Sequence, residues 1–129
     1  MLHDQFSLET LISANQSLKD ALTPPPANDR ERDGALQRFE YTVELSWRLI
    51  RKHLLALGRS DVGASPKPMI RAAASEGWIE NVDAWLAFIE ARNLTSHSYK
   101  QNIANQVFEA AKDFPVHVDK LIQHLRNIK

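Results

Sequence analysis

The densest group of polar side chains lies between Arg92 and Tyr99, a segment that reads Arg-Asn-Leu-Thr-Ser-His-Ser-Tyr. An arginine can bind a phosphate through two parallel hydrogen bonds and can neutralise charge that develops during phosphoryl transfer. A histidine titrates near neutrality and can move a proton to or from a ribose hydroxyl. Arg92 and His97 are therefore candidates for phosphoryl chemistry on RNA that requires no metal ion and no cofactor.

The spacing of these residues limits how one helix could present them. At about 100° per residue, Arg92 and Tyr99 fall within roughly 20° of each other, whereas His97 lies about 140° from Arg92. An unbroken helix would not direct Arg92 and His97 to one point. We expect either a helix break within Thr95–Ser98, whose residues have modest helix propensity, or a site to which two copies of the chain contribute.

A purely structural role for the same residues is the alternative. Arg92 would then form a salt bridge, His97 would cap a helix end and Tyr99 would pack against the protein. Spacing alone favours this alternative, because short Arg–His spacings are common in proteins of many kinds.

Two other pairs of side chains could be considered as metal ligands. His117 and His124 share a helix face, but no third ligand accompanies them, so we expect a solvent-facing pair. Glu40 and Glu44 lack the Glu-x-x-His pairing of metal sites in helical bundles, so we expect a charged helix face. The sequence also contains no glycine-rich phosphate loop. We expect no metal site and no ATP-dependent activity.

The composition indicates one globular domain that spans residues 1–129. Apolar residues make up 43% and charged residues 25% of the chain, and 16 basic and 16 acidic side chains give a formal net charge of zero. This balance argues against a protein that coats nucleic acid by bulk electrostatics, although a local basic site is compatible with it. The absence of cysteine excludes disulfide frameworks and thiol catalysis. Without a signal peptide or an apolar run of membrane-spanning length, we expect a cytoplasmic protein with no membrane partner.

Helical periodicity dominates the chain, and prolines and glycines divide it. We expect helices at about 7–22, 29–57 and 66–76, a fourth from 82, and a last one over 101–128 that Pro115 either kinks or restarts. The second carries an apolar stripe that consists of Leu36, Phe39, Val43, Trp47, Ile50, Leu54 and Leu57. The fold class is therefore all-α, an antiparallel four-helix-type bundle with one extra short helix. Further apolar residues, Leu45, Leu49 and Trp85, predict a homodimer formed through the second and fourth helices.

Three blocks of the chain, in order, resemble the nucleotidyltransferase substrate-binding protein family of the HEPN superfamily. They are DGALQRFEYTVELSW at 33–47, Ser65-Pro66 followed by Ile70-Arg71 and Ala73, and ARNLTSHSY at 91–99. The resemblance runs from about Phe6 to the C-terminus. The chain departs from the family pattern after the tyrosine, where Lys100-Gln101-Asn102 replaces an expected acidic residue.

The resemblance implies a homodimeric helical bundle in which the arginine and histidine elements of two chains face each other. It implies that Arg92 and His97 are catalytic, that Asn93 supports the site and that Tyr99 accepts AMP. The implied activity is that of a metal-independent endoribonuclease, the toxin of a toxin–antitoxin pair. Its antitoxin partner would be a minimal nucleotidyltransferase that modifies the tyrosine. The alternative is a non-catalytic subunit that presents substrate to a nucleotidyltransferase.

Overall fold

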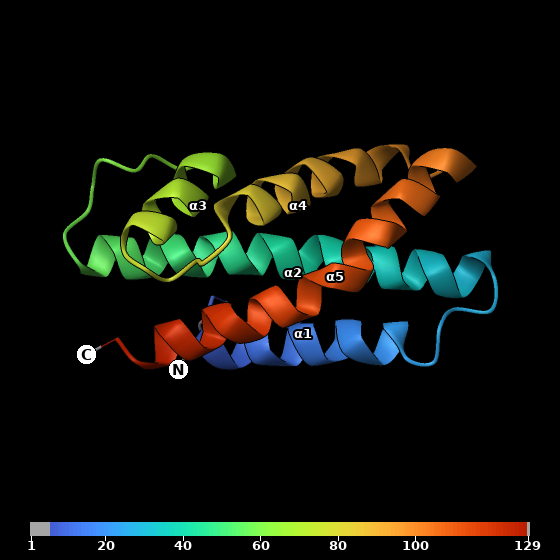
Figure 1. Cartoon of the computed structure of the whole chain (residues 1–129), viewed down its shortest axis with the longest axis horizontal. Coiled ribbons are helices and arrows are strands. Elements are labelled where there is room, and N and C mark those ends of the chain that lie inside the picture. Colours follow the sequence, from blue (N-terminus) through green and yellow to red (C-terminus); the bar gives the residue numbers. More distant parts are fainter. Residues whose placement is uncertain (1–5, 129) are drawn as a thin grey trace.

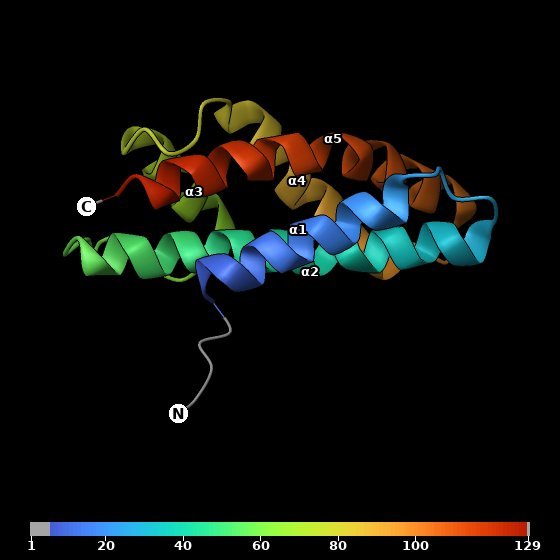
Figure 2. The same ribbon diagram turned by 90° about the horizontal axis from the view of Figure 1, so that it is seen from below.

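The computed structural model describes residues 6–128, and every regular element among them is a helix. The elements are α1 (Leu8–Leu22), α2 (Asp29–Ala56), α3 (Pro66–Ser75), α4 (Val82–Leu94), the 3₁₀ turn η1 (Thr95–His97) and α5 (Gln101–Arg126). The long helix α2 runs through the middle of the molecule, with α3 and α4 along one side and α1 along the other (Figure 1). Figure 2 shows α5 in a layer above α2, against which it also packs. The expected all-α bundle with one short extra helix is confirmed.

Local signals set the helix ends close to the expected positions. The side chains of Ser7 and Asn28 accept hydrogen bonds from backbone amides in the first turns of α1 and α2, at 3.1 and 2.9 Å. Gly58 and Gly77 adopt φ values of 84° and 82° just beyond α2 and α3, a left-handed conformation that favours glycine. Ser65 occupies the N-cap position of α3, but its side chain makes no capping hydrogen bond.

The core forms around the predicted stripe of α2, with one exception. Leu36 to Leu54 of the stripe are buried, but Leu57 is 49% exposed because α2 ends at Ala56 and Leu57 lies beyond the packed turns. Leu49 and Trp85, expected to supply a dimer surface, are instead 1% and 2% exposed within the chain's own core. Since α2 contacts all four other helices, apolar residues outside the main stripe also become buried. The expected dimer surface is therefore wrong for these two residues.

Pro115 lies inside α5 and does not start a new helix. The ribbon of α5 changes direction along its length in Figure 1, as expected where a proline removes a helical hydrogen bond. The Pro115 carbonyl accepts a hydrogen bond at 3.2 Å from the buried Asn15 side chain of α1. Among residues 6–128, no helix combines the length and apolar character needed to cross a membrane.

Candidate active site at the junction of α4 and α5

The segment from Arg92 to Tyr99 spans the end of one helix and the turn before the next. Helix α4 ends at Leu94, and Thr95–His97 form the 3₁₀ turn η1. The buried Thr95 hydroxyl donates to the Arg92 carbonyl at 2.7 Å, a local bond of the kind that competes with helix continuation. Backbone bonds from Ser98 to Thr95 and from Lys100 to His97, both 3.1 Å, complete the turn. The predicted helix break within Thr95–Ser98 is confirmed.

Arg92 lies against α2, where two glutamates face it. Its Nε atom is 2.8 Å from Glu44 Oε1 and its Nη2 atom is 3.7 Å from Glu40 Oε1. The Nε–H is not aligned for a hydrogen bond with Glu44, so the contact is an ion pair. The salt bridge of Arg92 that the structural alternative predicts is confirmed.

Glu44 joins Arg92 to a second arginine on α2. Its other carboxylate oxygen, Oε2, lies 3.3 Å from the Nε atom of Arg48. Glu40, Glu44, Arg48 and Arg92 thus form a cluster in which the formal charges cancel. The expectation of a charged helix face for the two glutamates is confirmed, but the sequence reasoning did not identify Arg92 as their partner. The four-residue spacing of the glutamates, which puts both on one face of α2, was the available signal.

The other motif residues face solvent. The side chains of Asn93 and His97 are exposed, and that of Tyr99 is 78% exposed. The rings of His97 and Tyr99 lie 6.3 Å apart, and Lys100 Nζ lies 5.9 Å from the centre of the Tyr99 ring. The structural alternative in which Tyr99 packs against the protein is therefore wrong. Among the contacts of the described residues, none joins Arg92 to His97.

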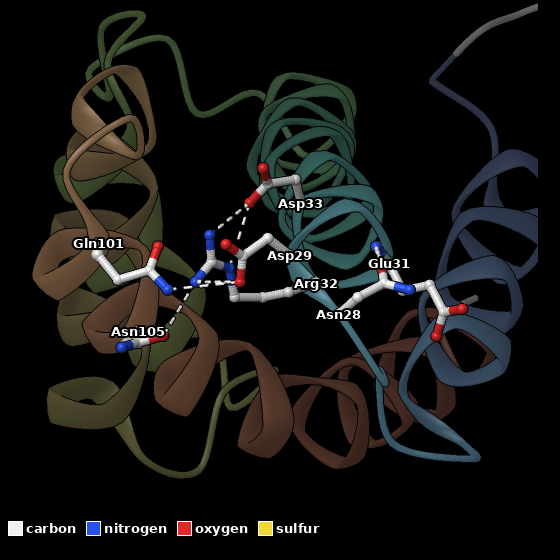
Figure 3. A network of polar contacts seen from close by, with 7 residues as sticks. All are labelled: Asn28, Asp29, Glu31, Arg32, Asp33, Gln101 and Asn105. Atoms are coloured by element: carbon white, nitrogen blue, oxygen red, sulfur yellow. Dashed lines mark hydrogen bonds and ion pairs between the residues drawn. The ribbon is translucent and has the colours of Figure 1, made fainter.

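A buried arginine holds the start of α5 against the start of α2 (Figure 3). The Arg32 side chain is only 10% exposed and forms ion pairs with Asp33 at 3.1 Å and Asp29 at 3.5 Å. Its Nη1 also donates to Asn105 of α5 at 3.1 Å, and Gln101 of α5 donates to Asp29 at 3.4 Å. These contacts, which we call the Arg32 network, anchor the helix that begins directly after the motif. The sequence reasoning did not single out Arg32.

The two histidines of α5 do not form the expected solvent-facing pair. The half-buried His117 ring packs 5.1 Å from Phe88, and this burial, with the nearby Lys120, lowers the pKa of His117. His124 Nε2 instead lies 3.1 Å from Glu80 Oε2. Each histidine therefore has a separate structural environment.

Comparisons with known proteins agree on one family. The family model described as nucleotidyltransferase substrate binding protein like matches residues 6–127. Over 140 residues, the chain is 31% identical to the probable ribonuclease HepT of Haemophilus influenzae, covering 98% of this chain and 96% of that protein.

Two solved structures have a similar fold. A Haemophilus influenzae protein, described as revealing the fold of a substrate binding domain of a nucleotidyltransferase, matches with a TM-score of 0.83 and 30% identity, over 94% of this chain and all of that one. A Thermus thermophilus protein matches with a TM-score of 0.79 and 31% identity, over 91% of this chain and 99% of that one. With the helical fold and the motif at the α4–α5 junction, these matches show that the chain belongs to the nucleotidyltransferase substrate-binding protein family.

Proposed function

We propose that the chain is a HEPN-type toxin that acts as a metal-independent endoribonuclease and pairs with a minimal nucleotidyltransferase as its antitoxin. The observation that carries this proposal is the break between α4 and α5, which exposes His97 and Tyr99 side by side a few residues from Arg92. The name of the Haemophilus influenzae relative, a probable ribonuclease, supports the same activity. RNA is then the substrate.

In this proposal Arg92 binds the scissile phosphate and His97 transfers a proton. The His97 imidazole accepts the proton of a ribose 2′-hydroxyl as the 2′-oxygen attacks phosphorus. The bond between phosphorus and the 5′-oxygen breaks, and that oxygen takes a proton from the His97 imidazolium. The products are a 2′,3′-cyclic phosphate and a 5′-hydroxyl. The Arg92 guanidinium stabilises the charge that develops on the phosphoryl oxygens. Asn93, exposed on the last turn of α4, supports the site.

The exposure of Tyr99 suits it to accept AMP from the proposed partner. The phenol oxygen would attack the α-phosphorus of ATP, lose its proton and displace pyrophosphate. Lys100, whose ammonium lies 5.9 Å from the phenol ring, places a positive charge near the new phosphate. The basic residue that departs from the family pattern therefore favours the modified state of Tyr99.

A second function is favoured by the contacts of Arg92. Glu44 and Glu40 balance the charge of the arginine in a single chain, so a phosphate must compete with two carboxylates to reach it. If Arg92 stays paired with these glutamates, it does not bind the scissile phosphate. The chain would then act as a non-catalytic subunit that presents substrate to a nucleotidyltransferase.

The experiment that separates the two functions measures cleavage of RNA. We expect His97→Ala to lose roughly 10²–10⁴-fold in rate, the usual contribution of a general acid or base. Arg92→Lys is also expected to fail, because an ammonium keeps the charge but cannot bind phosphate through two parallel bonds. EDTA is expected to leave the rate unchanged. Equal cleavage by wild type and His97→Ala, with circular dichroism showing intact helices, would overturn the ribonuclease assignment in favour of the non-catalytic subunit.

A further inference from the structure

A basic groove lies along the C-terminal half of α2. It has a volume of about 300 Å³, and its lining consists of Phe6, Arg48, Arg51, Lys52 and Leu55. Three of these five side chains are basic and none is acidic. The zero net charge of the chain therefore conceals a local concentration of positive charge.

The charges of this groove are only partly balanced. Arg48 shares Glu44 with Arg92. Arg51 donates from Nε to the Gly63 carbonyl at 3.0 Å and forms no ion pair with a carboxylate among residues 6–128. Because a backbone carbonyl carries no net charge, Arg51 retains a full positive charge that can attract an anion.

The apolar part of the lining restricts the kind of anion that fits. The Arg48 guanidinium lies 4.6 Å from the centre of a Trp47 ring and 5.7 Å from that of Phe6, within the range of cation–π contact. Phe6 and Leu55 add apolar surface beside the cations. Basic side chains interleaved with aromatic surface are typical of grooves that bind single-stranded nucleic acid.

The groove continues directly from the candidate active site. Glu44 contacts both Arg92 and Arg48, so only one carboxylate separates the proposed catalytic arginine from the first basic residue of the groove. With a rise of about 1.5 Å per residue, Arg51 and Lys52 lie roughly 10–12 Å farther along α2 than Glu44. A strand whose phosphate reaches Arg92 can therefore extend its backbone along this face of α2.

We infer that this groove binds the backbone phosphates of single-stranded RNA next to the phosphate that Arg92 holds. The inference rests on the proposed ribonuclease function and extends it by naming the residues that bind the substrate outside the reacting bond. An acidic surface of a protein partner could use the same cations, but the aromatic contacts of Arg48 and the continuity with Arg92 favour RNA.

The test measures how salt affects the binding of an RNA that the chain cannot cleave. A fluorescent single-stranded RNA with 2′-O-methyl groups lacks the attacking hydroxyl, and anisotropy over a range of salt concentrations gives the slope of log K against log[salt]. The groove variant combines Arg48→Gln, Arg51→Gln and Lys52→Gln. Since each phosphate contact to a single strand contributes about 0.7 to this slope, the variant is expected to lose about 2.

A matched control removes the same charge elsewhere. It combines the substitutions Lys112→Gln, Lys120→Gln and Arg126→Gln, all at exposed positions of α5. The control is expected to keep most of the wild-type slope, because the slope counts the phosphates in contact with the protein and the inferred contacts are made by the groove. A general effect of net charge would lower the slope equally in both variants. Circular dichroism confirms that both variants fold.

The possible outcomes separate this inference from the proposed function. If wild type cleaves RNA but the groove and control variants have equal slopes, the groove assignment is overturned and the ribonuclease proposal stands. The groove assignment is likewise overturned if the groove variant keeps its slope and loses only its binding to the nucleotidyltransferase. If wild type neither binds nor cleaves RNA, the proposed function itself fails.

Discussion

The rings of His97 and Tyr99 lie 6.3 Å apart with an interplanar angle of 61°. Both side chains face solvent on the short connection between α4 and α5. A nucleotide attached to the phenol oxygen of Tyr99 would therefore lie close to the histidine proposed to transfer the proton. Its negative charge and bulk would oppose the approach of an RNA phosphate to the same site.

We predict that Tyr99 gains one AMP when the partner nucleotidyltransferase and ATP are present, and that the modified chain loses ribonuclease activity. Intact-mass measurement detects the addition. The chain contains only two tyrosines, so Tyr41→Phe is a matched control. The Tyr41 hydroxyl donates to Ser17 at 3.1 Å and lies on α2. The mass gain is expected to persist in Tyr41→Phe and disappear in Tyr99→Phe; a gain that survives in Tyr99→Phe would place the acceptor elsewhere.

The helix pattern was predictable because the residues that set it act locally. The run Pro24–Pro26 ends α1, and glycines with positive φ follow α2 and α3. The break within Thr95–Ser98 was also predictable, since Thr95 bonds a carbonyl within its own turn. Each of these features depends on a few neighbouring residues, which the sequence displays directly.

The partners of the site residues were not predictable in the same way. Glu44 and Arg92 are on different helices, and only the packing of α4 against α2 brings them within 2.8 Å. Arg32 and Asn105 meet because the starts of α2 and α5 lie together. Trp85 was predicted to contribute to a dimer surface, but it is buried in the core of its own chain. Such pairings are set by tertiary structure, which the local patterns of the sequence do not reveal.

Glu44 is predicted to restrain phosphate binding at Arg92. Replacing it with glutamine removes the carboxylate that lies 2.8 Å from Arg92 Nε while keeping the side-chain shape. We expect the affinity for uncleavable RNA to rise by up to about fivefold, equivalent to the ~1 kcal/mol of an exposed charge pair. Glu109→Gln is the control, because Glu109 pairs with Lys112 on α5. An unchanged or lower affinity of Glu44→Gln relative to this control would contradict competition between Glu44 and RNA.

We predict that the chain is a homodimer whose active sites each take Arg92 from one chain and His97 from the other. Within one chain no contact of the described residues joins these two side chains, and we therefore expect a second copy of the chain to complete the site. Sedimentation at micromolar concentration is expected to show twice the mass of the chain. Monomer alone would exclude the shared site.

Mixing two inactive variants tests the sharing of residues directly. A dimer of one Arg92→Lys chain and one His97→Ala chain contains one intact arginine–histidine pair only if the pair spans two chains. Partial recovery of cleavage on mixing is therefore expected. A dimer that forms but recovers no activity would place both residues of each site in the same chain.

The Arg32 network is predicted to stabilise the fold and to hold the start of α5. Asn105→Ala removes the acceptor that lies 3.1 Å from Arg32 Nη1, and we expect the free energy of unfolding to fall by about 1 kcal/mol. Arg32→Ala is expected to cost more, roughly 1–3 kcal/mol, because it also removes a nearly buried side chain that is paired with two aspartates. The loss in unfolding free energy stays within this range because the two aspartates that lose their partner, Asp29 and Asp33, remain exposed to water. They also lie in the first turns of α2, where the helix dipole favours negative charge.

Urea unfolding followed by circular dichroism measures these changes, and Lys19→Ala provides the comparison. Lys19 forms an exposed ion pair with Asp119 at 2.9 Å, which also joins α5 to another helix but is expected to contribute less than about 1 kcal/mol. Hydrogen exchange gives a second, local readout. The amides of 101–105 are expected to exchange faster in Asn105→Ala than in Lys19→Ala, because only the former loses a contact in the first turns of α5. Equal exchange rates in the two variants would show that the start of α5 is held by buried apolar residues and not by Arg32.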